Sequence, residues 1–130
     1  MRKGTDVLAL TDPNEAYQRS QFDARVQGSD TAALVQLCLE QAIAGLRGAL
    51  LAHERADLAA RSKALTRALT AITALEMGVD RSAPLASALL SVYGAARRAV
   101  LKSVTAFDHE ALTSSSRDLI DIKTALDSVH

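Results

Sequence analysis

Histidine and glutamate are the residues of this chain that could bind a metal ion, but their spacing does not suit a metal site. A di-metal carboxylate site in a helical protein needs Glu-x-x-His pairs, because residues i and i+3 share one face of a helix. None of the glutamates in the later part of the chain has a histidine three residues on: Glu40, Glu54, Glu76 and Glu110. The histidines fall at predicted helix ends or at the last position: His53, His109 and His130. We therefore expect no metal ion and no other cofactor.

The residues that could act as nucleophiles or hold phosphate are also poorly placed for catalysis. Nucleophilic catalysis needs a cysteine or serine beside a histidine base. The single cysteine, Cys38, lies in an apolar stretch and is interpreted as a small core residue. Gly45 and Gly48 are not followed by the Lys-Ser/Thr pair of a phosphate-binding loop. We expect that the protein is not an enzyme.

Charge and aromatic content argue against nucleic-acid binding. The chain has 15 Lys+Arg and 15 Asp+Glu residues, and aromatic residues make up only 3%. A nucleic-acid-binding surface usually needs a basic excess or aromatic side chains on which bases stack. Arg97-Arg98 is the only adjacent basic pair in the predicted helices, and acidic residues are interleaved along the chain. We expect solvated helix faces and no nucleic-acid partner.

Nothing in the sequence indicates a secreted or membrane-spanning protein. The chain does not begin with a charged-then-apolar signal segment. We also find no apolar run long enough to span a bilayer. One cysteine cannot form an intrachain disulfide. The sequence therefore predicts a cytoplasmic protein without membrane insertion.

Composition and periodicity predict an all-α fold. Apolar residues make up 48% of the chain, and 25 residues are alanine, the strongest helix former. A sheet protein would draw its core from Val, Ile, Thr and aromatic residues instead. We predict an antiparallel up-down four-helix bundle with a short additional N-terminal helix. The predicted segments are a flexible stretch at 1–12, a single bundle domain at 13–130, a short helix at 13–24, and long helices at 31–53, 58–77, 83–106 and from 108 onward.

Capping residues mark the ends of these helices. Asp57 and Asp108 are each placed to cap the helix that follows. Gly78 is predicted to take the left-handed conformation that often ends a helix. Pro84 is placed in the first turn of the third long helix, after a loop at 79–81.

Two features leave alternatives open. Gly45 and Gly48, inside a predicted helix, indicate either close approach by another backbone or tolerance on the surface. The run from Thr113 to Ser116 favours caps and turns. The last helix is therefore either weak at this run or interrupted there.

The short N-terminal helix contains two of the four aromatic residues, Tyr17 and Phe22. A helix of about 12 residues is stable in water only when it packs against something. These two side chains are expected to anchor it over an apolar groove. They either complete the core or cover a groove that a partner would otherwise occupy.

In order and spacing, the sequence resembles the FliS family of flagellar secretion chaperones, as a divergent member. The similar segments begin at Ala16-Tyr17 and continue through Val26 and Asp30, followed by 34–42, 57–68 and 92–100. The family's Ser-Pro cap is replaced by Asp30-Thr31. Its Phe-Asp-Gly is replaced by residues 39–41, and its second signature tyrosine by Ala95.

The resemblance implies a chaperone that binds the C-terminal segment of newly made flagellin, prevents premature polymerisation and keeps the subunit competent for export. The segment around Tyr17 would act as a movable cover over the binding groove. The partner-binding residues that the resemblance implies are Tyr17, Leu34, Leu39, Ile43, Leu65, Leu69 and Tyr93. The alternative is a helical dimerisation or regulatory module of another bacterial system. The sequence leaves open a second partner in the export machinery, and whether the chain is a monomer or a homodimer.

Overall fold

The structure is a computed structural model that describes residues 31–128. Within that range the chain forms four α-helices and no strand. The helices are α3 (Thr31–Glu54), α4 (Leu58–Met77), α5 (Ala86–Thr105) and α6 (His109–Ser128). The all-α bundle is confirmed. The predicted helix at 13–24, and the predicted boundary between residues 12 and 13, lie outside the described residues.

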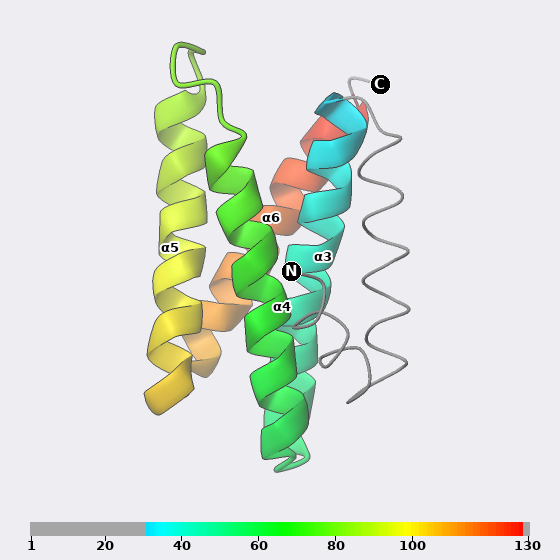
Figure 1. Ribbon diagram of the computed structural model, residues 1–130, viewed down its shortest axis with the longest axis vertical. Helices are drawn as coiled ribbons and strands as arrows, with labels where there is room; N and C mark the ends of the chain where they lie inside the picture. The colour runs from blue at the N-terminus through cyan, green and yellow to red at the C-terminus, as the bar shows by residue number, and fades with distance from the viewer. Residues whose placement is uncertain (1–30, 129–130) are drawn as a thin grey trace, which may run out of the picture. The chain divides into compact units, whose positions relative to one another are not determined.

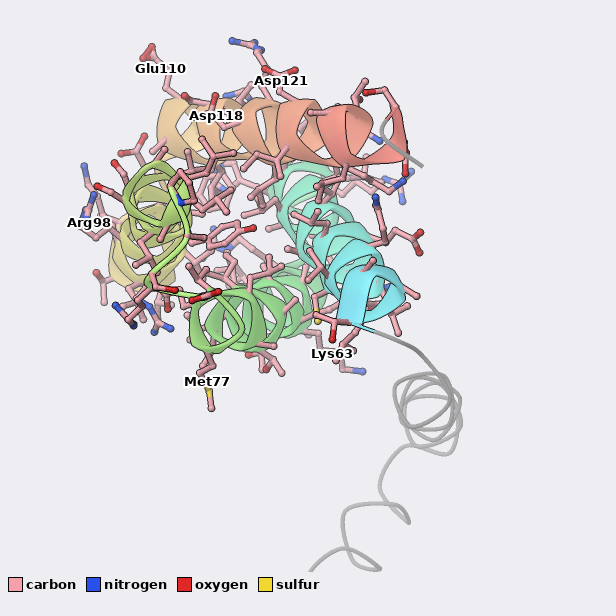
Figure 2. The ribbon with its side chains drawn as sticks, turned by 90° about the horizontal axis from the view of Figure 1, so that it is seen from above. Lys63, Met77, Arg98, Glu110, Asp118 and Asp121 are labelled. Atoms are coloured by element: carbon pink, nitrogen blue, oxygen red, sulfur yellow. The ribbon has the colours of Figure 1, made fainter. Side chains whose placement is uncertain are left out.

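Residues 35–130 form one compact unit, separate from residues 1–34, and the packing described below is that of this unit. The α3–α4 turn and the α5–α6 turn lie at one end of it, and the α4–α5 loop lies at the other (Figure 1). Short connections make consecutive helices antiparallel neighbours. Helix α6 runs obliquely across the other helices, from the end of α5 toward α3 (Figures 1 and 2).

All four helices contribute leucine, isoleucine or valine to the core, and alanine fills the space between them. Alanine at the contacts allows the helix backbones to approach closely. The largest fully buried apolar side chains are Leu39, Leu46, Ile72, Val100, Leu112 and Leu119. Alanines without any exposed surface lie on the first three of these helices, at Ala42, Ala49, Ala68 and Ala96.

Helices α3 and α4 touch backbone to backbone at Gly45. A Cβ atom added to Gly45 would lie 2.6 Å from the Ala68 nitrogen and 2.8 Å from the Ala64 oxygen. A Cβ atom on Gly48 would meet only the Ala64 Cβ, at 3.3 Å. Of the two alternatives for these glycines, close approach by another backbone is therefore correct, and Gly45 is the position that requires it.

Both predicted N-caps are present. The Asp57 Oδ1 accepts a hydrogen bond from the Ala60 N–H at 3.0 Å. The Asp108 Oδ1 accepts one from the Ala111 N–H, also at 3.0 Å. Each bond satisfies a donor in the first turn of α4 or α6, where the helix itself supplies no acceptor.

The prediction of a left-handed glycine after α4 was wrong. Gly78 has φ −87°, in the right-handed region, and its N–H donates to the Ala74 oxygen at 3.0 Å. The left-handed residue instead follows α3, where Ala56 has φ 55°. The Asp57 N–H then reaches back to the Ala52 oxygen at 2.9 Å, as in a Schellman turn. Alanine therefore takes the position that glycine usually fills.

The third long helix begins three residues later than predicted, at Ala86. Pro84 therefore lies in the preceding loop and not in the first helical turn, where it was predicted. The Asp80 Oδ1 accepts hydrogen bonds from the Ser82 N–H at 3.0 Å and from the Ser82 hydroxyl at 2.7 Å. This turn extends the α4–α5 connection over residues 78–85.

Helix α6 runs through the hydroxyl-rich segment without a break. Ser115 and Ser116 are buried. Small side chains at these positions let α6 pack closely despite their low helix propensity. The two alternatives for this segment, a weak helix and an interrupted one, therefore give way to a continuous helix held by packing.

Candidate partner-binding groove

A groove runs between the first half of α4 and the last part of α5. This is the end of the unit at which the α3–α4 and α5–α6 turns lie (Figure 1). Its lining combines apolar side chains with two hydroxyls and one cation. The lining residues are Leu58, Arg61, Ser62, Leu65, Thr66, Leu69, Val100 and Val104. No acidic side chain lines it within the described part of the chain.

The groove has a buried floor and an exposed apolar rim. Leu65 and Val100 are buried core residues and form part of the floor. Leu58 and Val104 are 64% and 61% exposed. Single exposed apolar residues are common on protein surfaces, whereas exposed ones that adjoin a buried apolar floor mark interaction sites. The groove is therefore an apolar surface without a partner among the described residues.

The size of the groove suits side chains better than a small molecule. It holds about 200 Å³, less than the roughly 300–1,000 Å³ of typical small-molecule pockets. A second hollow lies along α6, but all its lining residues belong to that one helix, between His109 and Arg117. Because a hollow beside a single helix has only one wall, the α4–α5 groove is the better candidate among the described residues.

A stacked cluster joins the α3–α4 and α5–α6 turns, and its Arg61 also lines the groove. The His53 and Phe107 rings lie 3.8 Å apart between centroids, with an interplanar angle of 9°. The Arg61 guanidinium lies 5.3 Å from the Phe107 centroid, within cation–π range. The Arg61 Nη1 also donates a hydrogen bond to the His53 Nδ1 at 2.9 Å. The cluster therefore orients Arg61 without neutralising it.

An ion pair joins α4 and α5 nearer their other ends. The Arg97 Nε donates to the Glu76 Oε1 at 2.8 Å, and the Arg97 Nη2 contacts the same oxygen. The Arg97 Nη2 also donates to the Thr73 hydroxyl at 2.8 Å. Hydrogen bonding to Glu76 raises the pKa of Arg97 above its usual value. This pair fixes the α4–α5 spacing from which the groove opens.

The buried titratable groups lie in the core and not in the groove. Burial raises the pKa of the Cys38 thiol, which keeps it protonated and unreactive. Burial, and then the nearby Cys38, raise the pKa of Tyr93. Among residues 31–128, no three His, Cys, Asp or Glu residues gather into a group that could hold a metal ion. Cys38 is thus the small core residue that the sequence predicted.

Comparison with known protein families identifies the chain. The family model described as flagellar protein FliS matches residues 13–130. The chain belongs to the FliS family. No curated protein matches it.

Membership of the FliS family assigns a role in flagellar export. FliS proteins are soluble cytoplasmic chaperones with flagellin-related partners, and they are not known as enzymes. This FliS chain has what such a role needs, a helical bundle with an apolar groove on its surface. The four helices are the described part of the FliS domain.

The predicted contact residues of this FliS chain differ widely in exposure. Leu65 and Leu69 both line the α4–α5 groove. Leu34 is half-buried on α3. Leu39, Ile43 and Tyr93 are buried core residues, and Tyr17 lies outside the described residues. The structure therefore brings two of the seven together in the groove, and a partner-binding role for the seven stays a prediction.

Sequence reasoning missed the exposed rim of the groove. Leu58 and Val104 lie on the apolar faces of their helices, and periodicity does not separate the exposed residues of such a face from the buried ones. The signal that could have separated them is their position, one at the start of α4 and the other near the end of α5. Helix ends often extend past the packed core, where apolar residues stay exposed.

Helix α3 is the one described helix whose length and apolar composition would also suit a membrane span, so the prediction that no apolar run is long enough was wrong for this helix. In the most apolar stretch of α3, 44% of the residues are buried inside the unit. Gly45, on the same helix, packs against the backbone of α4. A helix in the core of a bundle passes the same test of length and composition.

Proposed function

We propose that this FliS-family chain is a flagellin-specific export chaperone. It binds the C-terminal segment of flagellin in the cytoplasm, prevents premature polymerisation and keeps the subunit competent for export. The observation that carries the proposal is the α4–α5 groove, with exposed Leu58 and Val104 beside a buried floor. Family membership supplies the flagellin-related partner.

The groove suits helix-in-groove recognition. An amphipathic helix binds such a surface through apolar side chains at positions i, i+3, i+4 and i+7. The groove space of about 200 Å³ accommodates one or two large apolar side chains, as anchor residues at a helical interface need. Covering the apolar stripe of a flagellin segment would remove the surface through which subunits associate.

The proposal gives the predicted contact residues different roles. Leu65 and Leu69 contact flagellin directly in the groove. Leu39, Ile43 and Tyr93 support the helices from inside the core and contact flagellin only where the helices separate. Leu34 and Tyr17 stay candidate flagellin contacts because the family resemblance implies them.

The test is a binding measurement with two forms of flagellin. Full-length flagellin should form a complex with the purified chain at micromolar concentration or below, about −8 kcal/mol or tighter. Flagellin without its C-terminal segment should not bind. If both forms bind equally, or if neither binds, the proposed function is wrong.

Oligomeric state separates the proposal from the alternative of a dimerisation module. The export chaperone would keep its groove open for flagellin, so its mass in light scattering should change on addition of flagellin. A dimerisation module would form a concentration-dependent homodimer through the same apolar rim and show no affinity for flagellin.

A further inference from the structure

The neutral charge of the whole chain hides a strong segregation between helices. Helices α4 and α5 together carry six basic side chains and one acidic side chain, Glu76. Helix α6 carries four acidic side chains and two basic ones. The six basic residues are Arg61, Lys63, Arg67, Arg97, Arg98 and Lys102.

The charges of opposite sign lie on different sides of the bundle. Glu110, Asp118 and Asp121 extend from the outer face of α6, which lies across the bundle from α4 (Figure 2). Arg98 extends outward from α5 (Figure 2). The helix that carries most of the acidic side chains therefore lies across the bundle from α4, and Arg98 places a basic side chain on the outside of α5.

Two of the six cations are paired with carboxylates, Arg97 with Glu76 and Lys102 with Asp108, whereas Arg61 makes a different kind of contact. Glu76 is paired with Arg97, away from the end of the groove that Leu58 and Val104 flank. Arg61 lines the groove, and its side chain contacts the rings of His53 and Phe107. Arg61 is thus a fixed cation beside an exposed apolar surface.

We propose that the α4–α5 groove selects an acidic amphipathic helix. The apolar stripe of this helix packs between Leu58 and Val104, and a carboxylate flanking the stripe pairs with Arg61. The inference rests on the proposed function in one respect, namely that the occupant is the C-terminal segment of flagellin. The preference for acid over base follows from the groove alone.

Two features of the site make this selection effective. A guanidinium binds a carboxylate through two parallel N–H donors, and the stacked cluster already orients the Arg61 guanidinium. Arg98, which extends outward from α5, adds an attraction for an acidic segment that reaches about 10 Å at moderate salt. A basic amphipathic helix with the same apolar stripe would be repelled by Arg61 and by the other positive charge.

The test uses the full chain and two designed helical peptides. Both peptides carry leucines at i, i+3, i+4 and i+7, and one has glutamates where its twin has lysines beside that stripe. At about 50 mM salt the glutamate peptide should bind at least about tenfold more tightly than its lysine twin. At about 500 mM salt the preference should largely disappear, because screening removes the electrostatic part and leaves the apolar part.

Two variants locate the preference. Arg61→Gln should weaken binding of the glutamate peptide about fivefold at low salt and have little effect on the lysine twin. Arg117→Gln, which removes the same charge from the surface of α6, should change neither affinity by more than about twofold. Circular dichroism of both variants checks that the bundle is intact.

The outcomes separate the inference from the proposed function. Equal affinity for the two peptides, or a preference that Arg61→Gln leaves unchanged, would overturn the inference even if flagellin binds. An Arg61-dependent preference for the glutamate peptide, together with no affinity for flagellin, would support the inference and contradict the proposed function. If flagellin binds, and Arg61→Gln weakens this binding at low salt, the result would support both the inference and the proposed function.

Discussion

At the residue scale, Ala56 is the position where the backbone is least suited to its side chain. It has φ 55°, a conformation that costs a non-glycine residue roughly 1–2 kcal/mol. Ala56→Gly should therefore stabilise the bundle by about 0.5–1 kcal/mol, after allowance for the greater entropy of glycine in the unfolded chain. The measurement is the urea-unfolding free energy. Ala95→Gly, in the exposed interior of α5, is the control and should cost about 1 kcal/mol. A loss of stability in Ala56→Gly would contradict the turn geometry.

Asp108 gives a second prediction at this scale, on the pH dependence of stability. The Ala111 N–H, and then Lys102, hold the pKa of Asp108 below its usual value. The carboxylate therefore stabilises the fold above about pH 4, and this contribution is lost as the pH falls through the folded-state pKa. Asp108→Asn keeps a capping oxygen at every pH. The stability advantage of the wild type over this variant should shrink between about pH 6 and about pH 3. An advantage that is constant across this range in urea titrations would contradict the prediction.

At the element scale, the contact between α3 and α4 depends on the absence of one side chain. A Cβ atom on Gly45 would lie 2.6 Å from the Ala68 nitrogen, and backbone atoms cannot move aside as a flexible side chain can. Gly45→Ala should destabilise the bundle by about 1–3 kcal/mol although alanine is the better helix former. Gly48→Ala meets only one methyl group, at 3.3 Å, and should stay within about 1 kcal/mol of the wild type. Thermal unfolding of the two variants compares them directly. Equal effects would mean that the helices do not approach at Gly45.

Much of the element-scale structure was predictable, because it depends on local signals. The four long helices and the Asp57 and Asp108 caps follow from periodicity and from short-range hydrogen bonding. The start of α5 was predicted too early, because the Asp80–Ser82 hydrogen bonds that extend the loop depend on local backbone geometry. The left-handed turn was assigned to Gly78 because glycine favours that conformation, whereas packing of the α3–α4 turn places it at Ala56.

The candidate site was less predictable than the fold. Periodicity marks an apolar face on each helix, but it does not say which residues of that face stay uncovered when the helices pack. The family resemblance placed Tyr93 and Leu39 in the predicted site although they are buried, and it left out Leu58 and Val104 although they are exposed. The segregation of charge between α4–α5 and α6 is present in the sequence, but it acquires meaning only when the groove is placed between the two basic helices.

At the scale of the whole molecule, the bundle is a stable body whose one apolar groove is left for a partner, among the residues that the structure describes. Helices α4 and α5, which flank the groove, carry six basic side chains and one acidic side chain, and α6 carries four acidic side chains and two basic ones. Because like charges repel, two copies are disfavoured from docking groove to groove. The arrangement favours a chaperone that stays available for an acidic helical segment over a dimerisation module.

The most direct test of the central claim is the affinity of flagellin for a variant that changes only the exposed rim of the groove. The double variant Leu58→Ser and Val104→Ser removes two exposed apolar contacts, so the fold should be retained. Binding should weaken at least about 30-fold, which corresponds to about 2 kcal/mol of lost apolar burial. Met77→Ser removes an apolar side chain of α4 that is 81% exposed and lies outside the groove, and it should leave the affinity within about twofold. Equal affinity of the double variant and the wild type would contradict the claim that flagellin binds in the α4–α5 groove.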